Sequence, residues 1–217
     1  MYQYILFDLD GTVVDSGEGI IASAKYALTQ LGIEDQDDDK LKQFVGPPLV
    51  ATFQRVYQFT EERAVLAAKI FREYYDKQGK FQCALYEGMD KVLSRLHSEN
   101  KTLIIATSKP TNFAKDIAEY LGIACYFDDI IGSNLDNTRS KKGEILSYII
   151  EKYDIENLQD AVMIGDTVHD KIGAEQVGMP FIGVSYGYGF QIGEADADGL
   201  RLAGKPAELM EIAACIA

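Results

Sequence analysis

The stretch Phe7-Asp8-Leu9-Asp10-Gly11-Thr12-Val13 follows directly on a short apolar run near the start of the chain. In an extended strand alternate side chains share a face, so Asp8 and Asp10 point to one side and Leu9 to the other. Two neighbouring carboxylates on one face repel each other, so either the pKa of one is raised or the pair binds a cation. The pair is therefore a metal site, an acid/base pair or both, and the alternative is a strand end with an Asx turn into Gly11.

Further apolar runs of strand length recur along the chain, and helical periods separate them. Each run is apolar on both faces, as is typical of parallel strands covered by helices. Glycines such as Gly122 and Gly178 end the helical periods. This alternation predicts an α/β fold with a doubly wound, Rossmann-like parallel sheet. The predicted strands cover residues 4–7, 102–106, 129–131, 161–164 and 181–184.

Residues 16–79 break the alternation, because they carry helical patterns and no strand pattern. The turn Gly46-Pro47-Pro48 interrupts these helices, since proline and glycine together stop helical propagation. We therefore expect a core domain of residues 1–15 and 80–217 and an inserted helical domain of residues 16–79. Such inserts usually lie over the carboxyl edge of the sheet, where open α/β sheets bind ligands.

Composition limits the possible partners and the compartment. The 217 residues carry a formal net charge of −13, which disfavours a nucleic acid polymer or an anionic membrane as partner. An anionic substrate would need a local positive centre. The cysteines Cys83, Cys125 and Cys215 are far apart in sequence and form no metal motif, so we expect free thiols in a reducing cytoplasm. The sequence shows neither a leader peptide nor an apolar run of membrane-spanning length.

Two further polar segments lie near predicted strand ends. Thr107 and Ser108 follow the second strand and could offer hydroxyl and backbone N–H groups to an anion where a helix begins. They could equally be ordinary helix caps. Lys141 and Lys142 precede the helix that leads to the fourth strand, and either one could reach phosphate as a point charge.

The fourth predicted strand ends at a third polar segment. Asp166 stands at the strand exit, and Asp170 follows one helical turn later. The alternative is a turn residue at Asp166 and a helix-start charge at Asp170. All these groups map to one edge of one sheet, and hard oxygen ligands without histidine or cysteine suit Mg²⁺. The sequence therefore predicts a magnesium and phosphate site there.

The motifs Asp8-Leu9-Asp10-Gly11-Thr12, Thr107-Ser108-Lys109, Lys142 and Gly165-Asp166-Thr167-x-x-Asp170 resemble those of the haloacid dehalogenase-like phosphatases. The helical insert is similar to the small cap of the phosphoglycolate phosphatase branch, and the resemblance covers essentially the whole chain. It implies a phosphoric monoester hydrolase that acts on a small phosphorylated metabolite.

The resemblance also implies a role for each site residue. Asp8 would be the nucleophile that forms an aspartyl-phosphate, and Asp10 the acid/base. Mg²⁺ would be held by Asp8, by the backbone carbonyl of Asp10 and by Asp166, with Asp170 as a further or indirect ligand. The phosphoryl group would be bound by Thr107, Ser108 and Lys142, and the cap turn Gly46-Pro47-Pro48 would face the leaving group.

Several alternatives remain open at this point. On the same scaffold the substrate could instead be a nucleoside 5′-monophosphate, pyrophosphate or phosphotyrosine, and a sugar-phosphate mutase is a further possibility. A dehalogenase would need neither Asp10 nor a metal. A signalling module that binds Mg²⁺ and phosphate without turnover is the non-enzymatic alternative. The role of the segment from Tyr186 to Gly189 and the oligomeric state do not follow from the sequence.

Overall fold

The computed structural model describes residues 2–34, 36–134, 138–191 and 200–214. The chain forms two compact units. Unit 1 comprises Met1–Val14 and Leu85–Ala217, and unit 2 comprises Asp15–Ala84. The chain crosses the boundary between them at two short strands, β2 (Val14–Asp15) and β3 (Ala84–Leu85).

Unit 1 is built on a six-stranded sheet in the order β5-β4-β1-β6-β7-β8, in which all pairings are parallel. This order is that of a doubly wound sheet, whose ligands bind at the carboxyl ends of the strands where the strand order reverses. The predicted fold class is confirmed. The strands are β1 (Tyr4–Phe7), β4 (Thr102–Pro110), β5 (Asp129–Ser133), β6 (Ala161–Gly165), β7 (Phe181–Val184) and β8 (Leu202–Ala203).

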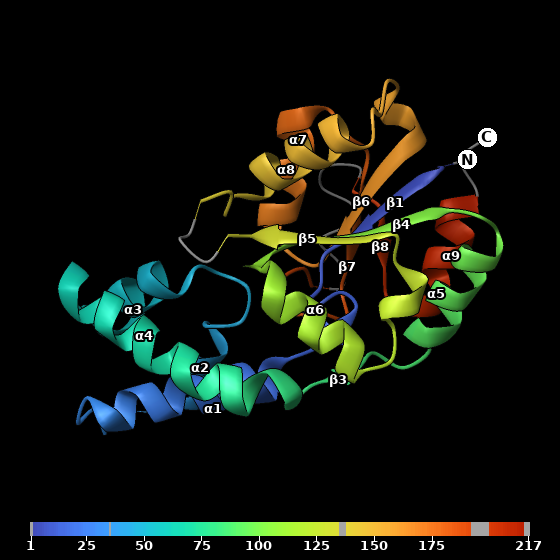
Figure 1. Cartoon of the computed structure of the whole chain (residues 1–217). Helices are drawn as coiled ribbons and strands as arrows, with labels where there is room; N and C mark the ends of the chain where they lie inside the picture. The colour runs from blue at the N-terminus through green and yellow to red at the C-terminus, as the bar shows by residue number, and fades with distance from the viewer. Residues whose placement is uncertain (1, 35, 135–137, 192–199, 215–217) are drawn as a thin grey trace. The chain divides into compact units, whose positions relative to one another are not determined.

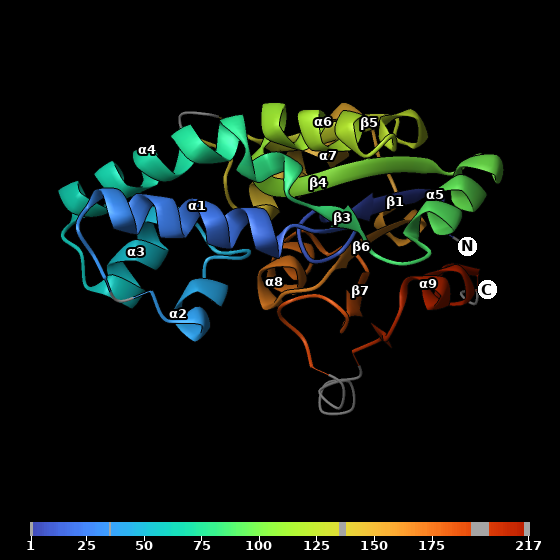
Figure 2. The same cartoon turned by 90° about the horizontal axis from the view of Figure 1, so that it is seen from below.

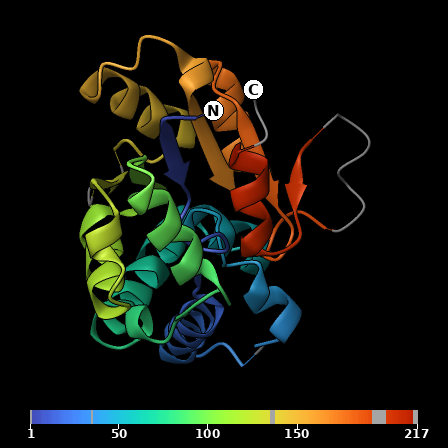
Figure 3. The same cartoon turned by 90° about the vertical axis from the view of Figure 1, so that its right-hand side faces the viewer.

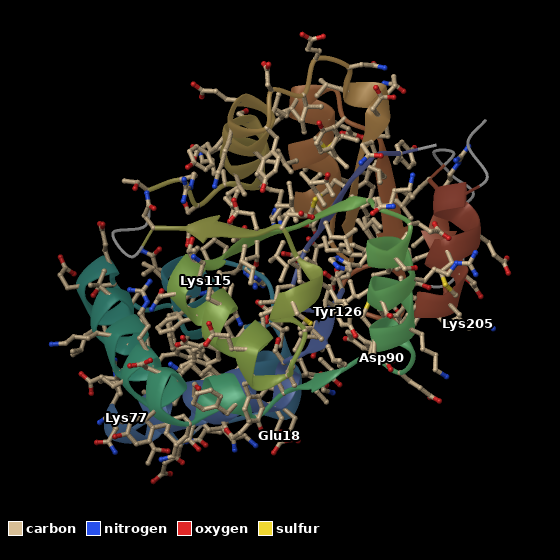
Figure 4. The ribbon with its side chains drawn as sticks, turned by 45° about the vertical axis from the view of Figure 1, so that its right-hand side comes forward. Glu18, Lys77, Asp90, Lys115, Tyr126 and Lys205 are labelled. Carbon is tan, nitrogen blue, oxygen red and sulfur yellow. The ribbon has the colours of Figure 1, made fainter. Side chains whose placement is uncertain are left out.

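Helices cover both faces of this sheet (Figures 1 and 3). One face carries α7 (Lys142–Lys152) and α8 (Val168–Val177), and the other carries α5 (Met89–Ser98), α6 (Thr111–Tyr120) and α9 (Pro206–Ala214). The first face buries Leu6, Ile104 and Met163 of the strands against Ile145 and Ile149 of α7. Charged residues on the outer side of the helices, such as Asp90, Lys115 and Lys205, are exposed (Figure 4). Short 3-10 turns, η2 (Ala124–Tyr126) and η3 (Leu158–Asp160), precede β5 and β6.

The apolar residues of α8 (Val168–Val177) do not all face the core. Ile172 is 44% exposed, and the helix instead buries the small residues Gly173 and Ala174. Here α8 packs closely against a neighbouring helix, so the buried positions must be small. The predicted end of the helix is confirmed at Gly178, which takes the left-handed conformation with φ of +75°. The strands β2, β3 and β8 and the helix α9 were not predicted, because they are short or carry no clear period.

Unit 2 consists of helices throughout its core. In it α1 (Gly17–Gln30) and α4 (Glu61–Lys77) run side by side (Figure 2), accompanied by α2 (Asp38–Lys42), α3 (Leu49–Tyr57) and the 3-10 turn η1 (Gly79–Phe81). The side chain of Thr60 accepts a hydrogen bond from Arg63 N and caps α4. The turn Gly46-Pro47-Pro48 lies between α2 and α3, with Pro48 at the N-cap of α3.

Two further expectations from the sequence concern thiols and membranes. Cys83 and Cys125 form no disulfide bond among the described residues, and Cys215 lies outside them. Within the described part of the chain, no helix is both long and apolar enough to cross a membrane.

Candidate active site

In unit 1 the parallel register brings the ends of β1 and β6 to the same level, beside the middle of β4. Phe7 of β1 lies opposite Ile105 of β4 and Ile164 of β6. The next residue, Asp8, donates its backbone N–H to the Ile164 carbonyl at 2.8 Å. The residues that follow each strand therefore meet at one edge, and the sequence-based grouping of Asp8 with Asp166 follows from the pairing.

Lys142 is the cation at the centre of this edge. Its Nζ lies 2.7 Å from Asp8 Oδ1, 2.7 Å from Asp170 Oδ1 and 2.8 Å from the Ala106 carbonyl. Its side chain is only 3% exposed, whereas Lys141 is exposed. Of the two lysines left open by the sequence, Lys142 is thus the one at the carboxylates.

Small residues allow Lys142 to reach this position. A Cβ on Gly173 of α8 would lie 2.6 Å from the Lys142 Cβ, and a Cβ on Gly143 would lie 2.3 Å from Oε1 of Gln176. Real Cβ atoms do not approach so closely, so glycine at position 173 lets α7 and α8 pack tightly, whereas the Gln176 side chain beside Gly143 is flexible and could move aside. The packing explains why Gly173 is buried, and it places the start of α7 beside the second half of α8.

Asp170 is held at the beginning of α8. Its Oδ2 accepts hydrogen bonds from the backbone N–H of Thr167 at 3.0 Å and from the Thr167 hydroxyl at 2.7 Å. The alternative interpretation, a helix-start carboxylate, therefore holds for one oxygen, while the other oxygen pairs with Lys142. Asp170 therefore performs both roles at once, whereas the sequence analysis treated them as alternatives.

Asp166 is buried beside the Asp8 motif. Its Oδ2 accepts a hydrogen bond from the backbone N–H of Tyr188 at 2.8 Å, while its buried Oδ1 has no hydrogen-bond partner among the described residues. Gly11, with φ of +82°, permits this packing, since a Cβ there would lie 2.2 Å from Asp166 Oδ2.

Asp10 forms a separate ion pair that the sequence analysis missed. Its Oδ1 lies 2.7 Å from Nζ of Lys109, and both side chains are largely buried. Lys109 belongs to the motif Thr107-Ser108-Lys109, but the sequence analysis predicted no role for this lysine. The expectation of a helix start at Thr107 is wrong, because β4 continues to Pro110 through an irregular register and α6 begins at Thr111.

The two hydroxyl residues of that motif differ in environment. Thr107 is buried, and its Oγ1 accepts a hydrogen bond from the backbone N–H of Lys109 at 3.2 Å. Ser108 is half-buried. Both lie at the irregular end of β4, so a helix dipole does not act on them directly.

Burial and mutual repulsion perturb the carboxylates. Burial raises the pKa of Asp8 to about 6, with Lys142 opposing the rise and Asp170 adding to it. Burial also raises the pKa of Asp166 to about 8, assisted by the negative charges of Asp8 and Asp170. Burial alone would lower the pKa of Lys142, but Asp170 and Asp8 outweigh it and raise the pKa. The lysine therefore stays charged while two neighbouring carboxyl groups resist ionisation.

These residues fit a divalent cation. Carboxylate oxygens of Asp8, Asp166 and Asp170 all lie within 4.8 Å of one another. A cation among them would supply the missing partner of Asp166 Oδ1 and offset the repulsion that raises the pKa values. Three carboxylates without a thiol or imidazole form a hard oxygen donor set that suits Mg²⁺. The side chain of Asp10 is not part of this group, whereas Asp170, expected as a further or indirect ligand, is part of it.

The comparisons with known proteins agree with the fold. The profile of the haloacid dehalogenase-like hydrolase family matches residues 5–184, most of the chain. The chain therefore belongs to this family and is a hydrolase, as its motifs predicted.

Individual relatives carry phosphatase or nucleotidase names. A 5′-nucleotidase from Pseudomonas aeruginosa is 40% identical over 188 residues, which are 87% of this chain and 85% of that protein. A phosphoglycolate phosphatase from Vibrio parahaemolyticus is 27% identical and covers 98% of this chain and 96% of its own length. The crystal structure of a predicted phosphatase from Clostridium acetobutylicum is similar with a TM-score of 0.91 and 42% identity, and it covers 98% of both chains.

Proposed function

We propose that this chain is a Mg²⁺-dependent phosphomonoester hydrolase that works through an aspartyl-phosphate on Asp8. The observation that carries the proposal is the contact of the Asp8 carboxylate with the buried Lys142 ammonium, beside Asp166 and Asp170. Such a centre holds a carboxylate nucleophile and the positive charge that a phosphate dianion needs in order to approach it. The phosphatase and nucleotidase names of the relatives support the same class of reaction.

The chemistry proceeds in two displacements. In the first, an Asp8 oxygen forms a bond to phosphorus as the bond to the ester oxygen breaks, and Asp10 donates a proton to that leaving oxygen. In the second, water attacks phosphorus, Asp10 takes a proton from the water, and the bond between phosphorus and Asp8 breaks. Inorganic phosphate leaves, and both aspartates return to their starting states.

The remaining residues bind the phosphoryl group and the metal. Lys142 and Thr107 would contact the phosphoryl oxygens, whose charge is spread out in the transition state, with Ser108 beside them. Asp8, Asp166 and the backbone carbonyl of Asp10 would hold Mg²⁺, together with Asp170. When bound, the metal would offset the negative charges of the Asp8 carboxylate and the phosphate.

The substrate class that we propose is a small phosphorylated metabolite, with nucleoside 5′-monophosphates as the first candidates. The 40% identical relative named 5′-nucleotidase favours them over phosphoglycolate, whose named relative is 27% identical. We propose residues 16–79 as the cap, and its turn Gly46-Pro47-Pro48 as the part that faces the leaving group.

Asp8→Asn tests the proposal. We expect it to abolish Mg²⁺-dependent hydrolysis of p-nitrophenyl phosphate, a loss of at least about 1,000-fold in kcat, because the amide is a poor nucleophile. The matched control is Asp90→Asn on the exposed start of α5, which should retain activity. Near wild-type activity in Asp8→Asn, or wild-type turnover in excess chelator, would refute the mechanism. A panel of nucleoside monophosphates, phosphoglycolate, sugar phosphates, phosphotyrosine and pyrophosphate would define the substrate.

A further inference from the structure

The segment of residues 186–190, which follows β7, surrounds Asp166 by backbone contacts. The N–H of Tyr188 donates to Asp166 Oδ2 at 2.8 Å, and the N–H of Phe190 donates to the Asp166 carbonyl at 2.9 Å. One segment thus binds both the side chain and the main chain of a single aspartate. We call residues 186–190 the Asp166 clamp.

Two glycines make this close approach possible. A Cβ on Gly187 would lie 2.2 Å from the Gly11 carbonyl oxygen and 2.5 Å from the Asp166 Cβ. A Cβ on Gly189 would lie 2.3 Å from the Asp166 carbonyl oxygen. Any other residue at these positions must push the clamp away from Asp166. The glycines of the sequence Tyr186-Gly187-Tyr188-Gly189 therefore have a steric reason that the sequence alone did not reveal.

Tyr186 anchors the clamp to the loop that follows β1. Its hydroxyl donates to the Thr12 carbonyl at 3.0 Å, and its ring meets Tyr86 edge to face at a centroid distance of 4.8 Å. Thr12 belongs to the same loop as Asp8 and Asp10. The clamp therefore ties the exit of β1 to the exit of β6 through β7.

We propose that the Asp166 clamp is a positioning device that orients the Asp166 carboxylate for a divalent cation. The clamp engages Oδ2 and leaves the buried Oδ1 without a hydrogen-bond partner in the described part of the structure. A carboxylate held by one oxygen cannot rotate freely, so its other oxygen stays directed into the group formed with Asp8 and Asp170. The inference rests on the proposed function, because it assigns Asp166 to the metal site.

Loss of the clamp should lower the affinity of the site for the metal. Partners that orient a metal ligand typically change affinity by about 10- to 100-fold when removed. Without the N–H of Tyr188 the carboxylate would have to be ordered by the cation itself, at a cost in rotational freedom. The clamp uses Oδ2 and the main-chain carbonyl of Asp166, so Oδ1 remains available to contact a cation.

Gly187→Ala is the decisive variant, with Gly204→Ala as its matched control. A Cβ on Gly204 would make only ordinary contacts, at 3.6 and 4.0 Å from Glu208. The full chain, freed of metal, would be titrated with MgCl₂ by calorimetry, and its thermal unfolding would be recorded without metal. We expect the Mg²⁺ Kd to rise about 10-fold or more in Gly187→Ala and to stay unchanged in Gly204→Ala. Saturating Mg²⁺ should restore much of the kcat of Gly187→Ala.

Two further variants separate the possible outcomes. Asp166→Asn should lose Mg²⁺ binding, and high Mg²⁺ should not restore its kcat. If its Mg²⁺ Kd equals that of wild type, both the proposed metal site and the proposed clamp are refuted. If Asp166→Asn loses binding while a folded Gly187→Ala keeps the wild-type Kd, only the clamp is overturned. Tyr186→Phe removes one hydrogen bond and keeps the ring. It should weaken Mg²⁺ binding by a smaller factor than Gly187→Ala. If Gly187→Ala does not fold, Tyr186→Phe tests the clamp instead, and an unchanged Mg²⁺ Kd would then overturn the proposal.

Discussion

Unit 1 and unit 2 both contain lysine–aspartate pairs, and two of these pairs, one from each unit, lie in very different environments. In unit 1 the side chain of Lys142 is 3% exposed and contacts two buried carboxylates. In unit 2 Lys25 lies 3.3 Å from Asp38, and these side chains are 44% and 77% exposed. A solvated pair gains little because water screens it, whereas a buried pair strongly penalises the loss of either partner. The contrast shows that burial, and not the number of ion pairs, identifies the site.

The largest effect that follows from this contrast is expected for Lys142→Met. The substitution leaves Asp8 and Asp170 without their shared cation in a buried place, which costs about 3–5 kcal/mol of stability in the metal-free protein. It also removes the charge that would meet the phosphoryl group, so we expect kcat/KM to fall at least about 100-fold. The control is the exposed neighbour, Lys141→Met, which should change neither quantity. Chemical denaturation and steady-state kinetics would measure both, and equal effects of the two variants would remove the distinction between the lysines.

A second prediction concerns pH and Asp166. Its pKa in the folded protein is raised to about 8 from an ordinary value of 3.8, so the folded state holds the proton more tightly than the unfolded state. The stabilisation is fully present below about pH 4 and is lost as pH rises through about 8. Asp8, with a pKa of about 6, has the same sign. We therefore expect the Tm of chelator-treated protein to fall between pH 5 and 8.

Asp166→Asn provides the control for this pH dependence. The amide does not titrate, so the variant should lose less stability over the same pH range than wild type. Mg²⁺ should raise the Tm of the wild-type protein more at pH 8 than at pH 6, because the metal binds the ionised carboxylates. Identical slopes in wild type and Asp166→Asn would contradict the assignment of the shift to Asp166.

A third prediction tests the pair of Lys109 and Asp10. Lys109→Met frees the Asp10 carboxylate from its cation, so we expect about a 10- to 100-fold loss of kcat on alkyl phosphates. The loss should be smaller on p-nitrophenyl phosphate, whose leaving group needs little protonation. Asp10→Asn should show the same preference more strongly, and Lys115→Met on the exposed face of α6 should show none. Equal losses on both substrates would argue that Lys109 does not act through Asp10.

The smallest effect is expected for Lys25→Met in unit 2. The exposed pair with Asp38 is screened by water and salt, so the free energy of unfolding should change by less than about 1 kcal/mol. Activity should remain at the wild-type level. Chemical denaturation at low and high salt measures the effect, and a loss comparable to that of Lys142→Met would break the contrast between the two units.

Much of the fold and part of the site could be predicted from the sequence. The runs at residues 4–7 and 161–164 are apolar on both faces, and parallel strands align their carboxyl ends, so Asp8 and Asp166 had to meet. The pairing of Lys109 with Asp10 could not be predicted, because it depends on the irregular end of β4. The exposure of Ile172 likewise depends on how closely α7 and α8 pack, which cannot be predicted from the spacing of apolar residues.

The sequence by itself determined how the five main strands alternate with helices along the chain, and which kinds of chemical group follow the strands. Those properties follow from local periodicity and from residue type. Only the tertiary structure decided which lysine contacts which carboxylate, and that Oδ1 of Asp166 has no hydrogen-bond partner among the residues that the structure describes. Contacts of this kind depend on backbone approaches allowed by Gly11, Gly173 and Gly187, where a single Cβ would separate the elements.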